Sequence, residues 1–254
     1  MIRLSSPDIG KEELNLIEQV FQSGYLVQGD MVETFESKLK EYFSCKHAIC
    51  VSSGTAALHL ACLSLDIAKE DEVIVPSFTF PATANIVEVI GANIKFVDIN
   101  LSNFCIDTSK LEKIITGKTK AIIPVHEFGH PVNMDEILKI AKKYNIFVVE
   151  DAACAFGSKH KDKYVGTYGN IGCFSLHPRK AITTGEGGIV VTNDDNLADK
   201  IKALRNHGII YEKGKPIFKY AGLNYRMTNF QGAMGIVQFD KFNKIYNKRI
   251  TIAK

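Results

Sequence analysis

The sequence has no apolar run approaching the ~20 residues that a helix needs to cross a membrane. Its first residues, MIRLSSPDIGKEEL, also lack the positively charged start and apolar core of a secretory signal. The net charge is only +3 and is spread along the chain, so no basic block indicates a nucleic-acid-binding surface. We therefore expect a cytoplasmic protein that binds neither membranes nor nucleic acids.

Cysteine-pairing motifs are missing too. The six cysteines occur singly and mostly inside apolar runs, without a C-x-x-C pair, at Cys45, Cys50, Cys62, Cys105, Cys154 and Cys173. This spacing excludes a small secreted framework held by disulfides, and we expect reduced thiols in the core. The chain also lacks internal repeats, low-complexity tracts and proline-rich linkers. Hydrophobic residues make up 46% and charged residues 23%, which is typical of a globular protein.

Short β-rich runs alternate with segments of helical periodicity. The strand-like runs are 47–52, 72–75, 94–97, 121–125 and 146–149. The helix-like segments between them are 56–65, 82–90 and 134–144. This βαβ alternation predicts an α/β fold with a mostly parallel sheet flanked by helices on both faces.

Further elements are expected at both ends of the chain. Two amphipathic helices should come first, one over 11–22 that ends at Gly24 and one over 31–43 with Asp30 as its N-cap. The strand-like runs 171–176 and 188–192 are joined by a short link, so we expect antiparallel neighbours at a sheet edge. The later segments are a helix over 196–205, a long loop over 207–225 and a last helix from Thr228 onward.

Ligands of an open parallel sheet collect beyond the carboxyl ends of its strands. The first strand-like run leads there into Ser53-Gly54-Thr55-Ala56 at the start of a helix. Free backbone N–H groups and the helix dipole at such a start favour a phosphate, and Gly54 would let the backbone come close. A tight turn with a threonine cap is the alternative interpretation.

Asp151 follows an apolar run and is succeeded only by small side chains, as if a flat group needed the space. A buried aspartate without a cationic partner would be driven toward its neutral form, whereas a protonated pyridine nitrogen would keep it charged. The alternative is an N-cap for a following helix.

Lys180 lies between a strand-like run and a glycine-rich turn, in SLHPRKAITTGEGG. Taken alone, it could be a solvated surface lysine. Its meaning depends on the motifs around it, which follow one another in a fixed order along almost the whole chain: SGYLVQGDMVETFE, SSGTAALHL, PSFTFPATAN, PVHEFGHPVNMDEI, VVEDAACAFGS, CFSLHPRKAITTGEGG and LNYRMTNFQGAMG.

In this order the motifs resemble those of the DegT/StrS-type sugar aminotransferases, which depend on pyridoxal 5'-phosphate (PLP). The resemblance implies an aspartate aminotransferase-like large domain. It places the cofactor's Schiff base on Lys180 and the partner of the pyridine nitrogen on Asp151. It also implies that Phe80 stacks on the cofactor ring, although a core phenylalanine is the alternative.

The same resemblance assigns the phosphate cradle to Gly54, Thr55 and Ser175. Cys154 stands where the family usually has a glutamine or histidine that contacts the ring hydroxyl, and a thiol is a weaker donor. Asn224 matches an asparagine that reaches the phosphate of the neighbouring subunit's cofactor. The resemblance therefore implies a homodimer with shared active sites.

The implied reaction moves an amino group from L-glutamate to a nucleotide-linked keto-deoxy sugar, with Lys180 as the general acid and base. Related dehydratases carry histidine where this chain has Lys180, which favours transamination. The ITTGEGG ending resembles family members that aminate C-4. A PLP-dependent dehydratase and a non-catalytic PLP-binding remnant are the alternatives.

The predicted domains are an N-terminal arm over 1–30, a PLP-binding large domain over 31–227 and the start of a smaller domain over 228–254. Family members continue into a complete C-terminal domain, so the chain looks truncated. His126 and His130 have i, i+4 spacing, but Gly129 and Pro131 disfavour a regular helix there, and we expect no metal site.

Overall fold

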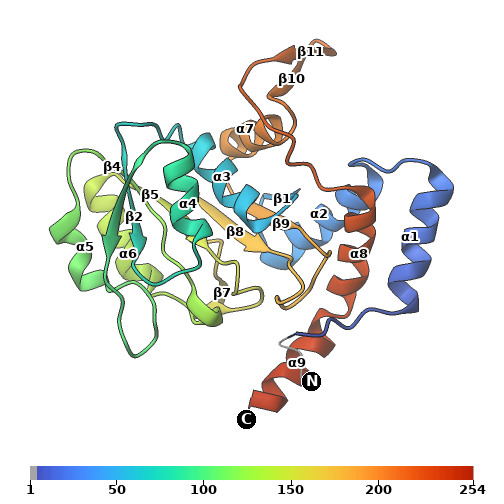
Figure 1. Ribbon diagram of the computed structural model, residues 1–254, viewed down its shortest axis with the longest axis horizontal. Helices are drawn as coiled ribbons and strands as arrows, with labels where there is room; N and C mark the ends of the chain where they lie inside the picture. Colours follow the sequence, from blue (N-terminus) through green and yellow to red (C-terminus); the bar gives the residue numbers. More distant parts are fainter. Residues whose placement is uncertain (1–4, 254) are drawn as a thin grey trace.

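The computed structural model describes residues 5–253 and has a seven-stranded sheet at its centre (Figure 1). In spatial order the strands are β1 (His47–Val51), β9 (Gly188–Thr192), β8 (Ile171–Ser175), β5 (Phe147–Asp151), β4 (Thr119–Ile122), β2 (Glu72–Pro76) and β3 (Asn93–Val97). The pairs from β8 to β3 are all parallel, whereas β9 is antiparallel to both of its neighbours. The predicted α/β class and mostly parallel sheet are confirmed.

Helices cover both faces of this sheet. In chain order the helices are α1 (Lys11–Ser23), α2 (Asp30–Phe43), α3 (Gly54–Ser64), α4 (Ala82–Val89), α5 (Thr108–Ile114), α6 (Met134–Tyr144), α7 (Asp195–Arg205), α8 (Asn229–Asp240) and α9 (Phe242–Ala253). Of these, α1 and α9 pack mainly against α8 and lie away from the sheet. Because strand side chains alternate between faces, Val73 and Val75 pack against α3 and α4 while Ile74 packs against α5 and α6. On that second face, α2 packs on α8 and covers β1, β8 and β9.

Several predicted boundaries need correction. The antiparallel pairing of β8 with β9 is confirmed, but neither strand is at the sheet edge, because β1 pairs with the outer side of β9. Gly24 ends α1 in a left-handed conformation, as predicted. Asp30 is the first residue of α2 rather than its N-cap, which is Gly29. The last predicted helix is two helices, α8 and α9, separated at Lys241.

The segment 207–225 is not one long loop, because it contains a β-hairpin. Its strands are β10 (Ile209–Glu212) and β11 (Lys215–Phe218), which project from the body of the molecule at the top of Figure 1. Lys213 and Gly214 connect them with positive φ angles of 50° and 78°. The structure also contains a second hairpin, in which the two-residue strands β6 (Lys159–His160) and β7 (Lys163–Tyr164) pair. Neither this hairpin nor the short helix α5 was predicted.

Five of the six cysteines are buried and all six are free thiols. Cys154 is the exception to the prediction of core thiols, because its side chain is exposed at the carboxyl edge of the sheet. Among residues 5–253, no helix combines the length and the apolar character needed to cross a membrane. The outermost residues of the predicted terminal segments, 1–4 and 254, lie outside the described chain.

Candidate active site

The strand directions bring the predicted site residues to one edge of the sheet. Strand β1 is antiparallel to β9, and β9 is antiparallel to β8, so β1 runs in the same direction as β8. Strand β8 is in turn parallel to β5. The ends of these three strands, which carry Gly54, Ser175 and Asp151, therefore meet at one edge, where ligands of such sheets bind.

Asp151 is the last residue of β5 and exposes only 5% of its surface. Its Oδ2 accepts a hydrogen bond from the Thr83 hydroxyl at 2.8 Å, and its Oδ1 accepts one from the backbone N–H of Ala153 at 3.1 Å. Burial raises the pKa of Asp151, whereas these hydrogen bonds and the charge of Lys180 act in the opposite direction. The alternative of a helix N-cap is wrong, because turns and the β6–β7 hairpin follow.

Lys180 lies in the link between β8 and β9 and points its amine toward the exposed thiol. Its Nζ is 3.0 Å from the Sγ of Cys154. Its backbone N–H donates to the carbonyl of His177 at 2.8 Å, and its carbonyl accepts from Nη2 of Arg249 at 2.8 Å. Lys180 is therefore held at both its backbone and its amine, unlike the solvated surface lysine of the alternative interpretation.

The predicted phosphate cradle is a close contact between two chain segments. A side chain at Gly54 would bring its Cβ to 2.9 Å from the Cβ of Ser175, so only glycine fits without a shift. Ser53 caps α3, because its hydroxyl accepts from the N–H of Ala56 at 3.0 Å. Thr55 is exposed and does not cap the helix, which corrects the threonine-cap alternative.

The two remaining predicted residues are solvent-exposed. Phe80 follows β2 and exposes 74% of its surface, so the alternative of a core phenylalanine is wrong. Asn224 lies on the return from the β10–β11 hairpin and forms an isolated bridge with Asn206. The next residue, Tyr225, accepts a hydrogen bond from the N–H of Ser52 at 2.9 Å, which ties this return to the end of β1.

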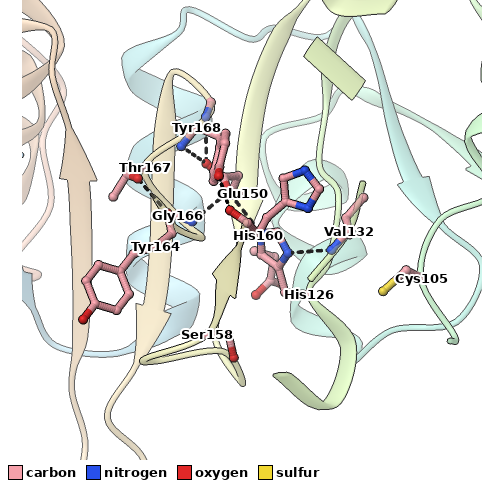
Figure 2. A network of polar contacts seen from close by, with 12 residues as sticks. Cys105, His126, Val132, Glu150, Ser158, His160, Tyr164, Gly166, Thr167 and Tyr168 are labelled. Carbon is pink, nitrogen blue, oxygen red and sulfur yellow. Dashed lines mark hydrogen bonds and ion pairs between the residues drawn. The ribbon is translucent and has the colours of Figure 1, made fainter. Parts of the chain in front are cut away.

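Sequence reasoning missed a buried polar pair beside Asp151 (Figure 2). The Nδ1 of His126 accepts from the N–H of Val132 at 3.1 Å, so its Nε2 must carry the hydrogen that faces Glu150 at 3.0 Å. Both side chains are fully buried. The backbone N–H of His126 also donates to the carbonyl of Asp151 at 3.0 Å. His126 is thus committed to this network.

Glu150 accepts three further hydrogen bonds, each at 2.7 Å, from the backbone N–H groups of Gly166, Tyr168 and Gly169. These bonds anchor the turn after β7 against β5. The only signal in the sequence was the pair of acidic residues in VVEDAA, of which the second alone seemed functional. Within residues 5–253, no group of three or more His, Cys, Asp or Glu side chains is suited to a metal ion.

The residues at this edge fit PLP. A buried carboxylate with a raised pKa suits a cationic ring nitrogen, which would replace the solvation that the carboxylate has lost. The close approach at Gly54 leaves room for a phosphate at the start of α3, and Lys180 offers a primary amine. Fold and site together define the class of PLP-dependent enzymes with the aspartate aminotransferase fold.

Comparison with known proteins identifies the family within this class. Residues 7–254 match the DegT/DnrJ/EryC1/StrS aminotransferase family, and the chain belongs to it. The GDP-perosamine synthase of Escherichia coli O157:H7 is 41% identical over 253 residues, which are 99% of this chain and 69% of that protein. The family and these relatives make the chain a member of the sugar aminotransferases.

Two solved structures support the same assignment. Helicobacter pylori PseC, an aminotransferase involved in the biosynthesis of pseudoaminic acid, is 35% identical with a TM-score of 0.89, covering 95% of this chain and 66% of its own. The putative sugar aminotransferase Spr1654 from Streptococcus pneumoniae in its PMP form is 28% identical with a TM-score of 0.94, covering 100% of this chain and 71% of its own. A PLP form of Spr1654 also matches, and PLP is the cofactor of this family.

The chain spans about two thirds of the length of these relatives, with shares of 69%, 66% and 71%.

Proposed function

We propose that this protein transfers an amino group from L-glutamate to C-4 of a nucleotide-linked keto-deoxy sugar. The observation that carries the proposal is the placement of the Lys180 amine next to Cys154, at the edge of the sheet where Asp151 is buried. The similarity to GDP-perosamine synthases supports a nucleotide-linked sugar as the acceptor. When bound, PLP supplies the carbonyl that takes up the amino group and the ring that accepts electrons.

Asp151 and Thr83 form the electrostatic part of the proposed mechanism. The carboxylate of Asp151 pairs with the ring nitrogen and keeps it protonated. The hydrogen bond from Thr83 favours the charged form of Asp151 and counteracts the effect of burial on its pKa. Asp151 would thus keep the ring nitrogen cationic, the state in which the ring would accept electrons best.

Lys180 performs the proton transfer. Once the amino donor is bound, the Nζ of Lys180 would take the proton from the donor's Cα and deliver it to C4' of the cofactor. The thiol of Cys154 lies 3.0 Å from this amine. It occupies the position where the family usually has a glutamine or histidine that contacts the ring hydroxyl. A lysine rather than a histidine at position 180 supports amino transfer over dehydration.

The remaining residues position the cofactor. Gly54, Thr55 and Ser175 bind the phosphate at the start of α3, where unpaired N–H groups face the ligand. Phe80 covers one face of the cofactor ring. Because the Phe80 side chain is exposed, its phenyl ring is free to make this contact.

We further propose that two copies share their active sites, with Asn224 reaching the partner's cofactor phosphate. Exposed apolar side chains on the projecting hairpin, Tyr211 and Phe218, support a contact with a second copy.

A two-stage experiment tests this function. Protein loaded with PLP should release one 2-oxoglutarate per cofactor when L-glutamate is added, and Lys180→Ala should release none. The resulting protein should then convert a nucleotide-linked 4-keto-6-deoxy sugar to its amino sugar, whose amino position NMR assigns. Bound PLP without release of 2-oxoglutarate would contradict an aminotransferase. Amination of a 3-keto sugar, offered in parallel, in preference to the 4-keto sugar would contradict the position alone.

A further inference from the structure

Three phenylalanines form an exposed aromatic cluster at the carboxyl edge of the sheet. Phe78 follows β2, Phe104 lies in the loop after β3, and Phe128 is in the 3-10 turn η1 (Glu127–Gly129) after β4. Their ring centroids are 5.7, 6.0 and 6.2 Å apart. The three residues expose 44%, 41% and 70% of their surfaces. We call this group the Phe78–Phe104–Phe128 cluster.

The backbone of this cluster is held in an unfavourable conformation. Phe104 and Phe128 have positive φ angles of 59° and 52°, which bulky side chains rarely adopt. Burial does not explain this strain, because both rings remain open to solvent. Strain of this kind persists where the surrounding structure enforces it, and it concentrates at ligand-binding sites.

Hydrogen bonds fix the two loops that carry the strained residues. The Sγ of Cys105, next to Phe104, donates to the carbonyl of His130 at 3.5 Å and joins the two loops. The hydroxyl of Ser158 donates to the carbonyl of Gly129 at 2.7 Å. Figure 2 shows Cys105, Ser158 and His126 around this turn. These hydrogen bonds therefore hold the loops that carry the Phe104 and Phe128 rings in place.

The cluster adjoins the proposed active site on two sides. Phe128 follows Glu127, whose pKa is raised by burial and by the charge of Asp151 and lowered by that of Lys180. On the other side, Phe78 precedes Thr79, whose hydroxyl is 2.8 Å from that of Thr83. Thr83 in turn bonds Asp151, so both segments that flank this carboxylate carry a ring of the cluster.

We propose that the Phe78–Phe104–Phe128 cluster binds the base of the nucleotide-linked sugar. This inference rests on the proposed function, in which the acceptor carries one flat aromatic group beyond its sugar. The rings meet at interplanar angles of 41°, 58° and 80°, so they form an open, angled surface instead of a closed stack. A base stacks on such rings through its π face. In this arrangement Phe80 contacts the cofactor, and the Phe78–Phe104–Phe128 cluster contacts the acceptor.

Glycine variants test the proposal without disturbing the loops. Phe104→Gly and Phe128→Gly each remove a ring while glycine adopts the left-handed conformation freely. GDP, UDP and dTDP are titrated separately by calorimetry into the PLP-loaded protein. We expect at least one to bind, and each variant to raise its Kd by about 5- to 100-fold, since stacking on one aromatic ring contributes that much.

The matched control is Phe96→Ala, which removes another exposed phenylalanine from the edge strand β3 outside the cluster. It should bind the nucleotide as the parent does. Release of 2-oxoglutarate from L-glutamate needs no nucleotide, so it should continue in Phe96→Ala, and its absence from the parent protein would contradict the proposed function instead.

Two results would overturn the base-binding role. One is that a parent protein that reacts with glutamate binds none of the three nucleotides. The other is an unchanged Kd in both glycine variants; if these variants also shift from dimer to monomer in sedimentation, the cluster belongs to the contact with a second copy of the chain. Melting temperatures measured in parallel show that the variants are folded.

Discussion

The hydroxyl of Thr83 donates to the Oδ2 of Asp151 over 2.8 Å, and both residues are buried. Thr83 is in α4 and Asp151 ends β5, so the bond joins two elements that lie far apart in the sequence. It stabilises the charged form of a carboxylate that burial alone would neutralise. Loss of this hydrogen bond should therefore weaken the binding of PLP.

Thr83→Val removes the hydroxyl while keeping the shape of the side chain. The pKa of Asp151 should rise further, and its pairing with the ring nitrogen should weaken. We expect the Kd for PLP, measured by absorbance titration, to rise about 10-fold, as hydrogen bonds to charged groups contribute ~1.5–3 kcal/mol. Thr83→Ser keeps the hydroxyl and should bind PLP as the parent does. Equal affinity in all three proteins would contradict this role.

The stability of the cofactor-free protein should depend on pH through Asp151. Its folded pKa is raised, so the folded state holds its proton more tightly than the unfolded state, and stability falls as pH rises from about 3.9 through the folded pKa. Asp151→Asn abolishes this loss. Its melting temperature should equal that of the parent near pH 4 and exceed it near pH 8, by a margin that grows as the pH rises.

The contrary result is a difference in melting temperature between Asp151→Asn and the parent that is constant or shrinks as pH rises. The same variant should gain no stability from added PLP, whereas the parent should gain it by mass action.

Glu150 should be essential for folding rather than for chemistry. Its carboxylate accepts three backbone N–H groups and the Nε2–H of His126. Glu150→Gln turns one acceptor atom into a donor that faces donors. We expect about 2–4 kcal/mol less free energy of unfolding in urea denaturation. Glu88→Gln, at an exposed position, should stay within about 0.5 kcal/mol of the parent. Similar values for the two variants would refute the network.

Cys154 should be the one cysteine that reacts quickly with iodoacetamide in the native protein. Burial raises the pKa of Cys45 to about 11 and that of Cys62 to about 12, and the other buried thiols shift the same way. Cys154 is exposed at the site, so bound PLP should protect it. Mass spectrometry should find a single modified cysteine without PLP. Fast modification of a second cysteine, or no protection, would count against this placement.

Much of the fold follows from local patterns. The helix over 134–144 matches its predicted bounds because its apolar residues recur at helical spacing above a polar face. The sequence did not reveal the hairpin over 209–218, because none of its strand residues is buried and they show no alternation of buried and exposed residues. The seven residues of α5 are too few to show a clear period.

Local sequence patterns likewise predict some features of the candidate site and not others. Motif order singled out Asp151, Lys180 and the turn at Gly54, which lie at or shortly after the carboxyl ends of β5, β8 and β1. The contacts that tune them join distant parts of the chain, such as Thr83 with Asp151 and Cys154 with Lys180. Such pairs depend on tertiary packing, which no local pattern encodes. For the same reason the Phe78–Phe104–Phe128 cluster was invisible in the sequence.

The central claim is that Lys180 holds the cofactor. Protein loaded with PLP is reduced with borohydride, digested and analysed by mass spectrometry, with Lys180→Ala and the charge-retaining Lys180→Arg treated in parallel. We expect a pyridoxyl group on the peptide that contains Lys180, and no such group in either variant. A pyridoxyl group on another lysine, or its persistence in Lys180→Ala at the level of the parent, would contradict it.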